Sequence, residues 1–229
     1  MSPEPQILAL GGHGMQPGEP LDDFLLELTG AERPRVLLIP TASAENAEYV
    51  VRFYECFGRR TRASHLRLFG IPTQGIRDVI LDQDAIFVGG GNTANMLAVW
   101  RVHGVDEALR EAWERGIVLA GSSAGSICWF DAGVTDSFRA ELDGLECLGF
   151  LPGSNCPHYD GEETRRPAYH RLVAGGLPPG LAAEDFVGLR FRGLELAEVV
   201  TSRPGSQAYR VERVDGGVRE TPLSARLLQ

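Results

Sequence analysis

Short apolar runs recur along the first part of the chain at intervals that suit buried strands. Each run is rich in Val, Ile, Leu or Phe, which is typical of strands that are covered on both faces of a parallel sheet. The predicted strands are residues 6–10, 35–39, 64–69, 84–88 and 117–121.

The segments between these runs have helical periodicity. Residues 21–28 predict a short helix, and Ser43 is a candidate N-cap of a second helix that ends at Gly58. The second helix would place one apolar face at Ala47, Val50, Val51, Tyr54 and Phe57. Two further helices carry stripes at Met96, Leu97 and Trp100, then at Val105, Ala108, Leu109, Ala112 and Trp113 before Gly116.

This alternation predicts an α/β fold, a three-layer sandwich in which helices flank a mainly parallel sheet. Binding and catalytic groups of such sheets lie at the carboxyl ends of the strands. Three glycine-rich loops fall at these ends, at residues 11–14, 89–91 and 121–125. The first loop lacks the third glycine of a dinucleotide fingerprint, because Pro17 stands there, so close backbone approach is its expected role.

The remaining hundred or so residues have a weaker pattern. Residues 131–160 are expected to be loop-rich, and 162–173 helical despite Pro167. Short strands are predicted at 186–191, 197–201 and 207–214, with a turn at Gly216 and Gly217. Neither a repeat nor a linker is visible, so the chain is interpreted as a single domain over residues 1–229.

Composition and charge limit the classes of partner that the protein is expected to bind. The net charge of −9 disfavours nucleic acid, and no apolar run approaches the ~18 residues that cross a membrane. The first residues do not have the form of a secretory signal. The four cysteines, which are dispersed and expected to be reduced, point with these features to a cytoplasmic protein. Because all basic residues are arginine, lysine-based catalysis is excluded.

The fifth predicted strand leads into Gly121-Ser122-Ser123-Ala124-Gly125, which has the form of a nucleophile elbow. In this motif a strand turns sharply into a helix and exposes a serine at the apex. Glycines two residues before and after Ser123 leave room for the tight turn. Ser123 is therefore the candidate nucleophile.

A serine nucleophile needs a base, and two of the five histidines are well placed for this role. His158 lies in the irregular segment 154–160 after the elbow, and His13 lies in the first glycine loop. The other three are expected in packing or surface positions, namely His65, His103 and His170.

A carboxylate should orient the base, but spacing does not choose among the acids. Those between serine and histidine are Asp131, Asp136, Glu141, Asp143 and Glu146. Those after the histidine include Asp160, Glu162, Glu163, Glu184 and Asp185.

Two backbone N–H groups would complete the site as an oxyanion hole. The Ala124 amide follows the nucleophile, and Gly90 or Gly91 could supply the second donor. The glycine run is not a P-loop, because no Lys-Ser/Thr pair follows it. A metal bound by Cys156, His158 and Asp160 is a weaker interpretation, since no second ligand cluster is evident.

The motifs 89–93 (GGGNT), 121–126 (GSSAGS) and 156–159 (CPHY) together resemble the peptidase E (aspartyl dipeptidase) family, whose pattern cyanophycinases share. Their order and spacing fit that family over about residues 6–200. The resemblance implies a fold like class I glutamine amidotransferases, of flavodoxin-like type.

The resemblance also implies roles for single residues. Ser123 would be the nucleophile, His158 the base, and the Gly90 and Ala124 amides the oxyanion hole. The acid would be Glu184, with Asp185 and Asp136 as alternatives. Asn92 and Arg165 would bind substrate, the arginine through an acidic side chain, with Arg166 as a competitor.

The expected function is a serine exopeptidase that hydrolyses short peptides through an acyl-enzyme on Ser123. Dipeptides with an acidic residue, Asp in particular, are the expected substrates. No cofactor or metal is needed, and the short loops are compatible with a homodimer. The alternatives are a hydrolase of the same fold that acts on cyanophycin-type β-aspartyl-arginine peptides, amides or esters, and a non-catalytic binding protein.

Overall fold

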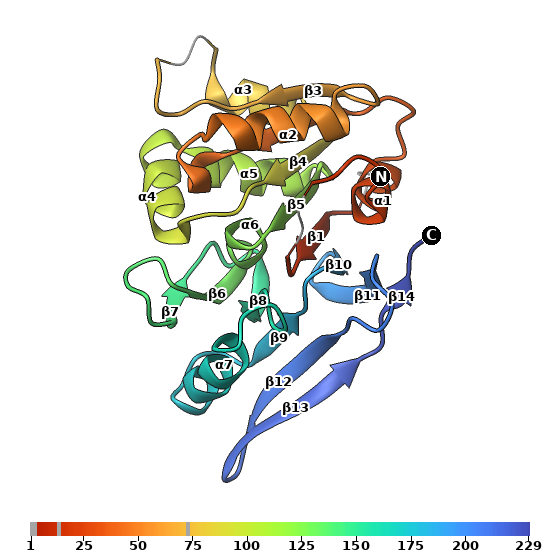
Figure 1. Cartoon of the computed structure of the whole chain (residues 1–229). Coiled ribbons are helices and arrows are strands. Elements are labelled where there is room, and N and C mark those ends of the chain that lie inside the picture. Colours follow the sequence, from red (N-terminus) through yellow and green to blue (C-terminus); the bar gives the residue numbers. More distant parts are fainter. Residues whose placement is uncertain (1–3, 13–14, 72–73) are drawn as a thin grey trace.

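The strands form two sheets that adjoin each other (Figure 1). The computed structural model describes residues 4–12, 15–71 and 74–229. The first sheet has eight strands in the order β14-β11-β10-β1-β5-β4-β2-β3. Its strands are β1 (Gln6–Leu10), β2 (Arg35–Ile39), β3 (Arg62–His65), β4 (Ala85–Val88), β5 (Val118–Ser122), β10 (Val187–Arg192), β11 (Glu195–Thr201) and β14 (Arg226–Leu227).

Five of these strands, β1 to β5, run parallel, as the sequence predicts. β10 pairs antiparallel with β1, and β11 pairs antiparallel with β10. Parallel strands are buried on both faces, and β2, β4 and β5 are almost entirely buried. The mixed α/β fold with flanking helices is therefore confirmed, with an antiparallel extension at the β1 edge.

Helices cover the two faces of this sheet unequally. α1 (Pro20–Leu28) and α2 (Ala47–Phe57) pack on one face through an apolar cluster that includes Leu8, Phe53 and Phe87. α3 (Ile76–Leu81), α4 (Thr93–His103) and α5 (Val105–Glu114) pack on the other. The predicted stripes of α4 and α5 are buried in full.

The prediction for α2 is wrong in two details. Asn46, not Ser43, caps the helix, because its side chain accepts the Tyr49 N–H at 3.0 Å, while residues 41–43 form a short 3₁₀ turn. The buried face is centred on Phe53 and Phe57, whereas Val51 is 56% exposed.

The second sheet has six strands in the order β13-β12-β9-β8-β6-β7. The loop-rich prediction for residues 131–160 is therefore wrong, because three of these strands lie there. The strands are β6 (Phe130–Thr135), β7 (Asp143–Glu146), β8 (Leu151–Cys156), β9 (Gly180–Ala183), β12 (Ala208–Val214) and β13 (Gly217–Leu223). β12 matches the strand predicted at 207–214. β6, β7 and β8 mix polar residues with glycine, so hydropathy alone does not reveal them.

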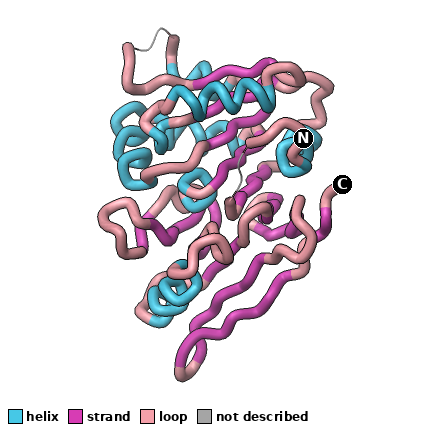
Figure 2. The backbone as a smooth tube through the Cα atoms, in the orientation of Figure 1, coloured by secondary structure: helices cyan, strands magenta, loops and turns pink. Residues whose placement is uncertain are grey.

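α7 (Arg165–Ala174) packs against the second sheet through a third apolar cluster that includes Tyr169 and Val211. Pro167 lies in its first turn, where a missing N–H costs no helical hydrogen bond. Figure 2 shows the β12–β13 hairpin as two long magenta strands beside this helix. Within the described residues, no helix is both long and apolar enough to cross a membrane.

Candidate active site

Ser123 lies at a sharp turn between β5 and the short helix α6 (Ala124–Ile127), with φ 58° and ψ −113°. A non-glycine residue in this region is strained, and such strain is concentrated at functional sites. A Cβ on Gly121 would lie 2.3 Å from the Gly125 carbonyl oxygen, and one on Gly125 would lie 2.1 Å from that of Val88. Both flanking glycines are therefore required by backbone packing, as a nucleophile elbow demands.

Three consecutive carbonyl groups at the end of β1 hold three separate segments of the site. Leu10 O accepts the Ser123 N–H at 3.4 Å, and Gly11 O accepts the His158 N–H at 3.0 Å. Gly12 O accepts the Phe186 N–H at 2.7 Å, and Gly12 bridges to Asp185. The first glycine loop thus brings the elbow, the histidine loop and the acidic loop to one place.

His158 and Asp185 form a hydrogen-bonded pair, with Nδ1 2.8 Å from Oδ1. Their side chains are 24% and 28% exposed, so the pair is reachable from solvent. The hydrogen bond from His158 lowers the pKa of Asp185, burial raises it, and the charge of Arg203 lowers it further. A Cβ on Gly12 would lie 1.7 Å from Asp185 Oδ1. The close approach expected of this glycine loop is therefore observed.

Asp185, and not Glu184, is the carboxylate that faces the histidine. The Glu184 carboxylate accepts the Tyr209 hydroxyl at 2.8 Å and the Gln207 N–H at 2.9 Å. The sequence predicts Glu184 as the acid beside His158, and the structure places its alternative, Asp185, there instead. Adjacent residues of an extended chain point to opposite sides, so the two acids cannot both face His158.

The remaining acid alternative and the other histidines are placed elsewhere. Asp136 is exposed in the loop after β6. His65 Nδ1 contacts the Tyr54 hydroxyl at 2.9 Å, and His170 Nε2 contacts Glu220 at 2.9 Å. His13, the second candidate base, lies outside the described residues.

The oxyanion-hole prediction needs one revision. The Gly90 N–H donates to the Tyr49 hydroxyl at 3.2 Å, so this amide is already occupied. Among the residues that the structure describes, the amides of Gly91 and Ala124 donate no hydrogen bond. Gly90 still matters sterically, because a Cβ there would lie 3.3 Å from Ser123 Cβ. Within the described residues, the Ala124 amide next to Ser123 is therefore an unused donor, and Gly91 carries the unused amide of the glycine run.

The two predicted substrate-binding residues are engaged within the protein. Asn92 caps α4 by accepting the Asn95 N–H at 2.9 Å, and its side-chain N–H donates to Ser137 O at 2.9 Å. Its amide therefore supports the fold.

Arg165 is only 5% exposed, and its guanidinium donates to Glu162 Oε2 at 2.7 Å and to Val134 O at 3.2 Å. Its neighbour Arg166 pairs with Glu220 at 2.7 Å. Both arginines therefore have carboxylate partners in the protein.

The residues of the weaker metal interpretation are engaged in different contacts. Asp160 accepts the Asp185 N–H at 2.8 Å and pairs with Arg203, and Cys156 is buried. Within the described ranges, no three His, Cys, Asp or Glu side chains group as metal ligands.

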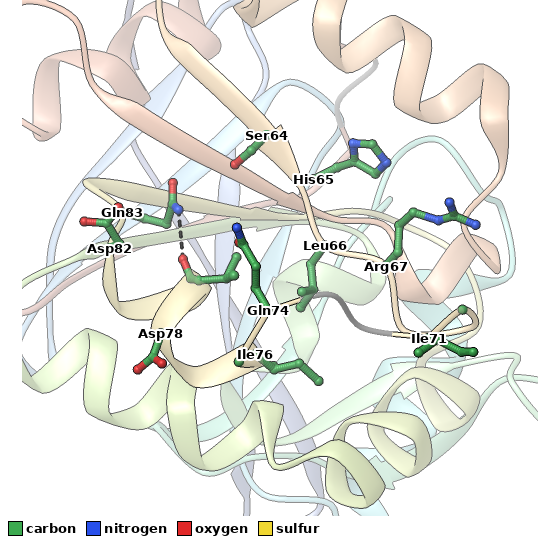
Figure 3. A pocket seen from close by; sticks show the side chains of 13 residues that line it. Ser64, His65, Leu66, Arg67, Ile71, Gln74, Ile76, Asp78, Asp82 and Gln83 are labelled. Atoms are coloured by element: carbon green, nitrogen blue, oxygen red, sulfur yellow. Dashed lines mark hydrogen bonds between the residues drawn. The ribbon is translucent and has the colours of Figure 1, made fainter.

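A hollow of about 930 Å³ lies beside the edge strand β3, remote from the elbow (Figure 3). Ser64, Asp78 and Gln83 are among the residues that line it. β3 is the outermost strand of the sheet, three strands away from β5. This hollow is therefore separate from Ser123.

Comparison with known families matches this chain to peptidase family S51 over residues 7–199. The chain belongs to peptidase family S51. Family S51 consists of serine peptidases, so the chain is a peptidase of the serine type. The resemblance read from the three motifs is thereby confirmed.

Relatives span different shares of the chain. An uncharacterized peptidase, YgaJ, of Bacillus subtilis is 46% identical over 97% of this chain and 99% of its own length. Peptidase E of Shewanella denitrificans is 30% identical over 67% of this chain and 65% of its own. The match to the Bacillus subtilis protein thus covers nearly the whole of both chains.

Two solved structures share the fold. A peptidase from an acI-B1 Actinobacterium has a TM-score of 0.73 at 16% identity, covering 98% of this chain and 96% of its own. A putative peptidase E protein from Listeria monocytogenes has a TM-score of 0.64 at 18% identity, covering 87% and 98%. The fold of this chain is therefore shared with these two structures.

Sequence reasoning missed residues that act through packing or support. Gly12 is one, since only the structure shows the carboxylate that its missing side chain admits. Tyr49 and Arg203 are others. Each lies about 40 residues away in sequence from the residue that it contacts, Gly90 and Asp160 respectively. No local motif marks such contacts.

Proposed function

We propose that Ser123, His158 and Asp185 form the catalytic triad of this S51 peptidase. The observation that carries the proposal is the end of β1, where carbonyls of Leu10, Gly11 and Gly12 bind the three triad segments. A triad drawn from three segments needs such a common support, because small displacements of reacting groups cost large factors in rate.

In the proposed reaction, the Ser123 hydroxyl attacks the peptide carbonyl and His158 takes its proton. Asp185 accepts the hydrogen bond from Nδ1, which fixes the tautomer and stabilises the imidazolium. The amides of Ala124 and Gly91 donate to the oxyanion. His158 then protonates the leaving amine, and water hydrolyses the acyl-enzyme with His158 again as base.

The proposed substrates are short peptides cleaved from an end, because aspartyl dipeptidases share the three motifs. Recognition of an acidic side chain by Arg165 would require the guanidinium to leave Glu162. This pairing favours the second candidate function, a peptidase of the same mechanism that does not require an N-terminal Asp.

The four cysteines are described as free thiols, three of them buried, which suits a reducing compartment. On that basis we extend the proposal to a cytoplasmic location. Fractionation of cells that produce the protein tests this part.

A panel of Asp-X dipeptides, neutral dipeptides, longer peptides and esters tests the proposal. Wild-type protein should hydrolyse at least one class, and Ser123→Ala should abolish turnover while the protein remains folded. Undiminished hydrolysis by Ser123→Ala would refute the assignment of Ser123 as the nucleophile. Equal rates on Asp-X and neutral dipeptides would favour the second candidate function.

A further inference from the structure

Arg203, in the loop between β11 and β12, lies against the peptide units on both sides of Asp185. Its guanidinium pairs with Asp160, and the other carboxylate oxygen of Asp160 accepts the Asp185 N–H at 2.8 Å. Arg203 Nη2 also donates to Asp185 O at 3.4 Å, while Nε donates to Ser206 Oγ at 2.8 Å. Both backbone polar groups of Asp185 are thus held by one arginine–carboxylate pair.

The residue after Asp185 needs this support. Phe186 has φ 65°, a left-handed conformation that is costly for a bulky residue and persists only where surroundings enforce it. The Arg203 guanidinium lies 5.0 Å from the centre of the Phe186 ring. Thr201 Oγ1 donates to Phe186 O at 2.9 Å, from the same end of β11. The side chains of Thr201 and Arg203 therefore contact the strained turn.

We propose that Arg203 is a positioning residue of the active site. Through Asp160 it fixes the backbone of Asp185 and so aims the carboxylate at His158 Nδ1. The inference rests on the proposed function, in which Asp185 orients the catalytic base. Arg203 itself does not touch the substrate.

Exposure supports a positioning role over a stabilising one. The side chains of Arg203 and Asp160 are 43% and 33% exposed. Ion pairs at this exposure contribute little to the free energy of unfolding. A displaced catalytic group, in contrast, costs about 100-fold in rate for about 1 Å of movement. Loss of Arg203 should therefore reduce turnover much more than stability.

The last part of the chain, which includes Arg203, makes several contacts near the triad residues. The match to family S51 ends at residue 199, and Arg203 lies after it. Tyr209 and Glu220, also beyond that point, bind Glu184 and Tyr159, the neighbours of the two triad residues, at 2.8 and 2.6 Å. Support of the triad by the last part of the chain is therefore not confined to one contact.

The test compares Arg203→Gln with a matched control, Arg226→Gln. Arg226 is an exposed arginine of the same part of the chain, and it pairs with Glu198 at 2.7 Å. Arg203→Gln should lower kcat by about 10- to 100-fold with KM changed less than about twofold. Arg203→Lys should recover part of the loss, since an ammonium can pair with Asp160 but lacks the planar fork. Arg226→Gln should retain wild-type kcat.

A double variant tests whether the pair acts as a unit. Asp160→Asn should lower kcat by a similar factor, and Arg203→Gln combined with Asp160→Asn should be little worse than either single variant. Multiplicative losses would overturn the proposal, because they would mean that the two residues act separately.

A second readout does not depend on catalysis. The His158 Nδ1 proton, hydrogen-bonded to Asp185, should give a low-field proton NMR resonance that Arg203→Gln shifts or broadens and Arg226→Gln leaves unchanged. An unaltered resonance together with wild-type kcat in Arg203→Gln would overturn the proposal, as would a loss confined to KM.

The two proposals fail in different ways. A wild-type protein without hydrolysis of any peptide or ester would refute the proposed function, yet the resonance would still report whether Arg203 positions Asp185. If the wild type is active and Arg203→Gln changes neither kcat nor the resonance, only the positioning role is refuted.

Discussion

The two halves of the candidate site are held by different kinds of contact. Ser123 lies at the end of a buried parallel strand, and its surroundings are set by backbone packing at Gly121, Gly125 and Gly90. His158 and Asp185 lie on loops that follow strands of the second sheet, partly open to solvent.

Side chains rather than packed backbone support the second half. Arg203 and Asp160 hold the backbone of Asp185, and Tyr209 holds the adjacent Glu184. Each half should therefore fail in its own way. Added atoms should disrupt the half of the site that carries Ser123, the nucleophile half. Removal of polar groups should disrupt the half that carries His158 and Asp185, the base half.

Two neighbouring acids give the largest expected contrast. Asp185→Asn should lower kcat by about 10³- to 10⁴-fold, because the amide cannot stabilise the imidazolium and favours the wrong tautomer. Glu184→Gln should lower it less than about tenfold, since Glu184 acts only by anchoring to Tyr209. Steady-state kinetics on the best substrate, with circular dichroism as a check of folding, measures both. A larger loss in Glu184→Gln than in Asp185→Asn would contradict the assignment.

The nucleophile half should respond to a single methyl group. Gly125→Ala would place Cβ 2.1 Å from the Val88 carbonyl oxygen. Because this oxygen belongs to the backbone, it can move away only at a high energetic cost. The expected loss is at least about 2 kcal/mol in the free energy of unfolding, measured by urea denaturation.

Gly70→Ala is the matched control. A Cβ at Gly70 would meet only the flexible end of Arg67 at 3.7 Å. It should change stability by less than about 0.5 kcal/mol. Equal stability of the two variants would show that the elbow is not closely packed.

Substrate choice should depend on the partner of Arg165. Glu162→Gln removes the carboxylate that Arg165 contacts at 2.7 Å, which leaves the guanidinium able to bind an acidic substrate. We expect the preference for Asp-X over neutral dipeptides, as a ratio of kcat/KM, to rise by about tenfold. Glu163→Gln, at an exposed neighbouring position, should leave the ratio unchanged. An unchanged ratio in both would remove Arg165 from substrate recognition.

A smaller effect should appear in stability at low pH. The pKa of Asp185 is below its ordinary value of 3.8, chiefly through the hydrogen bond from His158. A depressed carboxyl pKa contributes stability that is present above the unfolded value and lost as pH falls through the folded one. The stability difference between wild type and Asp185→Asn should therefore be steady near pH 5 and narrow below about pH 4. A difference that stays constant to about pH 3 would contradict this linkage.

The same division explains what could be predicted from sequence. The parallel strands, the helices α4 and α5 and the elbow follow from hydrophobic periodicity and glycine spacing, which are local signals. Apart from β12, the second sheet does not, because strands such as β7 and β8 are short and rich in Gly and polar residues.

The acid illustrates the physical limit most clearly. Glu184 and Asp185 are adjacent, and a one-residue difference at the end of an extended segment decides which one faces His158. Spacing and residue type are nearly the same for both. The decision comes from Gly12, Arg203 and Tyr209, which are distant in sequence.

The central claim is that the two halves cooperate in activating Ser123. The most direct measurement is the rate at which a fluorophosphonate modifies the protein, followed by intact-mass spectrometry and peptide mapping. We expect a single adduct on Ser123, absent in Ser123→Ala and formed at least about 100-fold more slowly in Asp185→Asn. Modification at another residue, or labelling of Asp185→Asn at the wild-type rate, would contradict it.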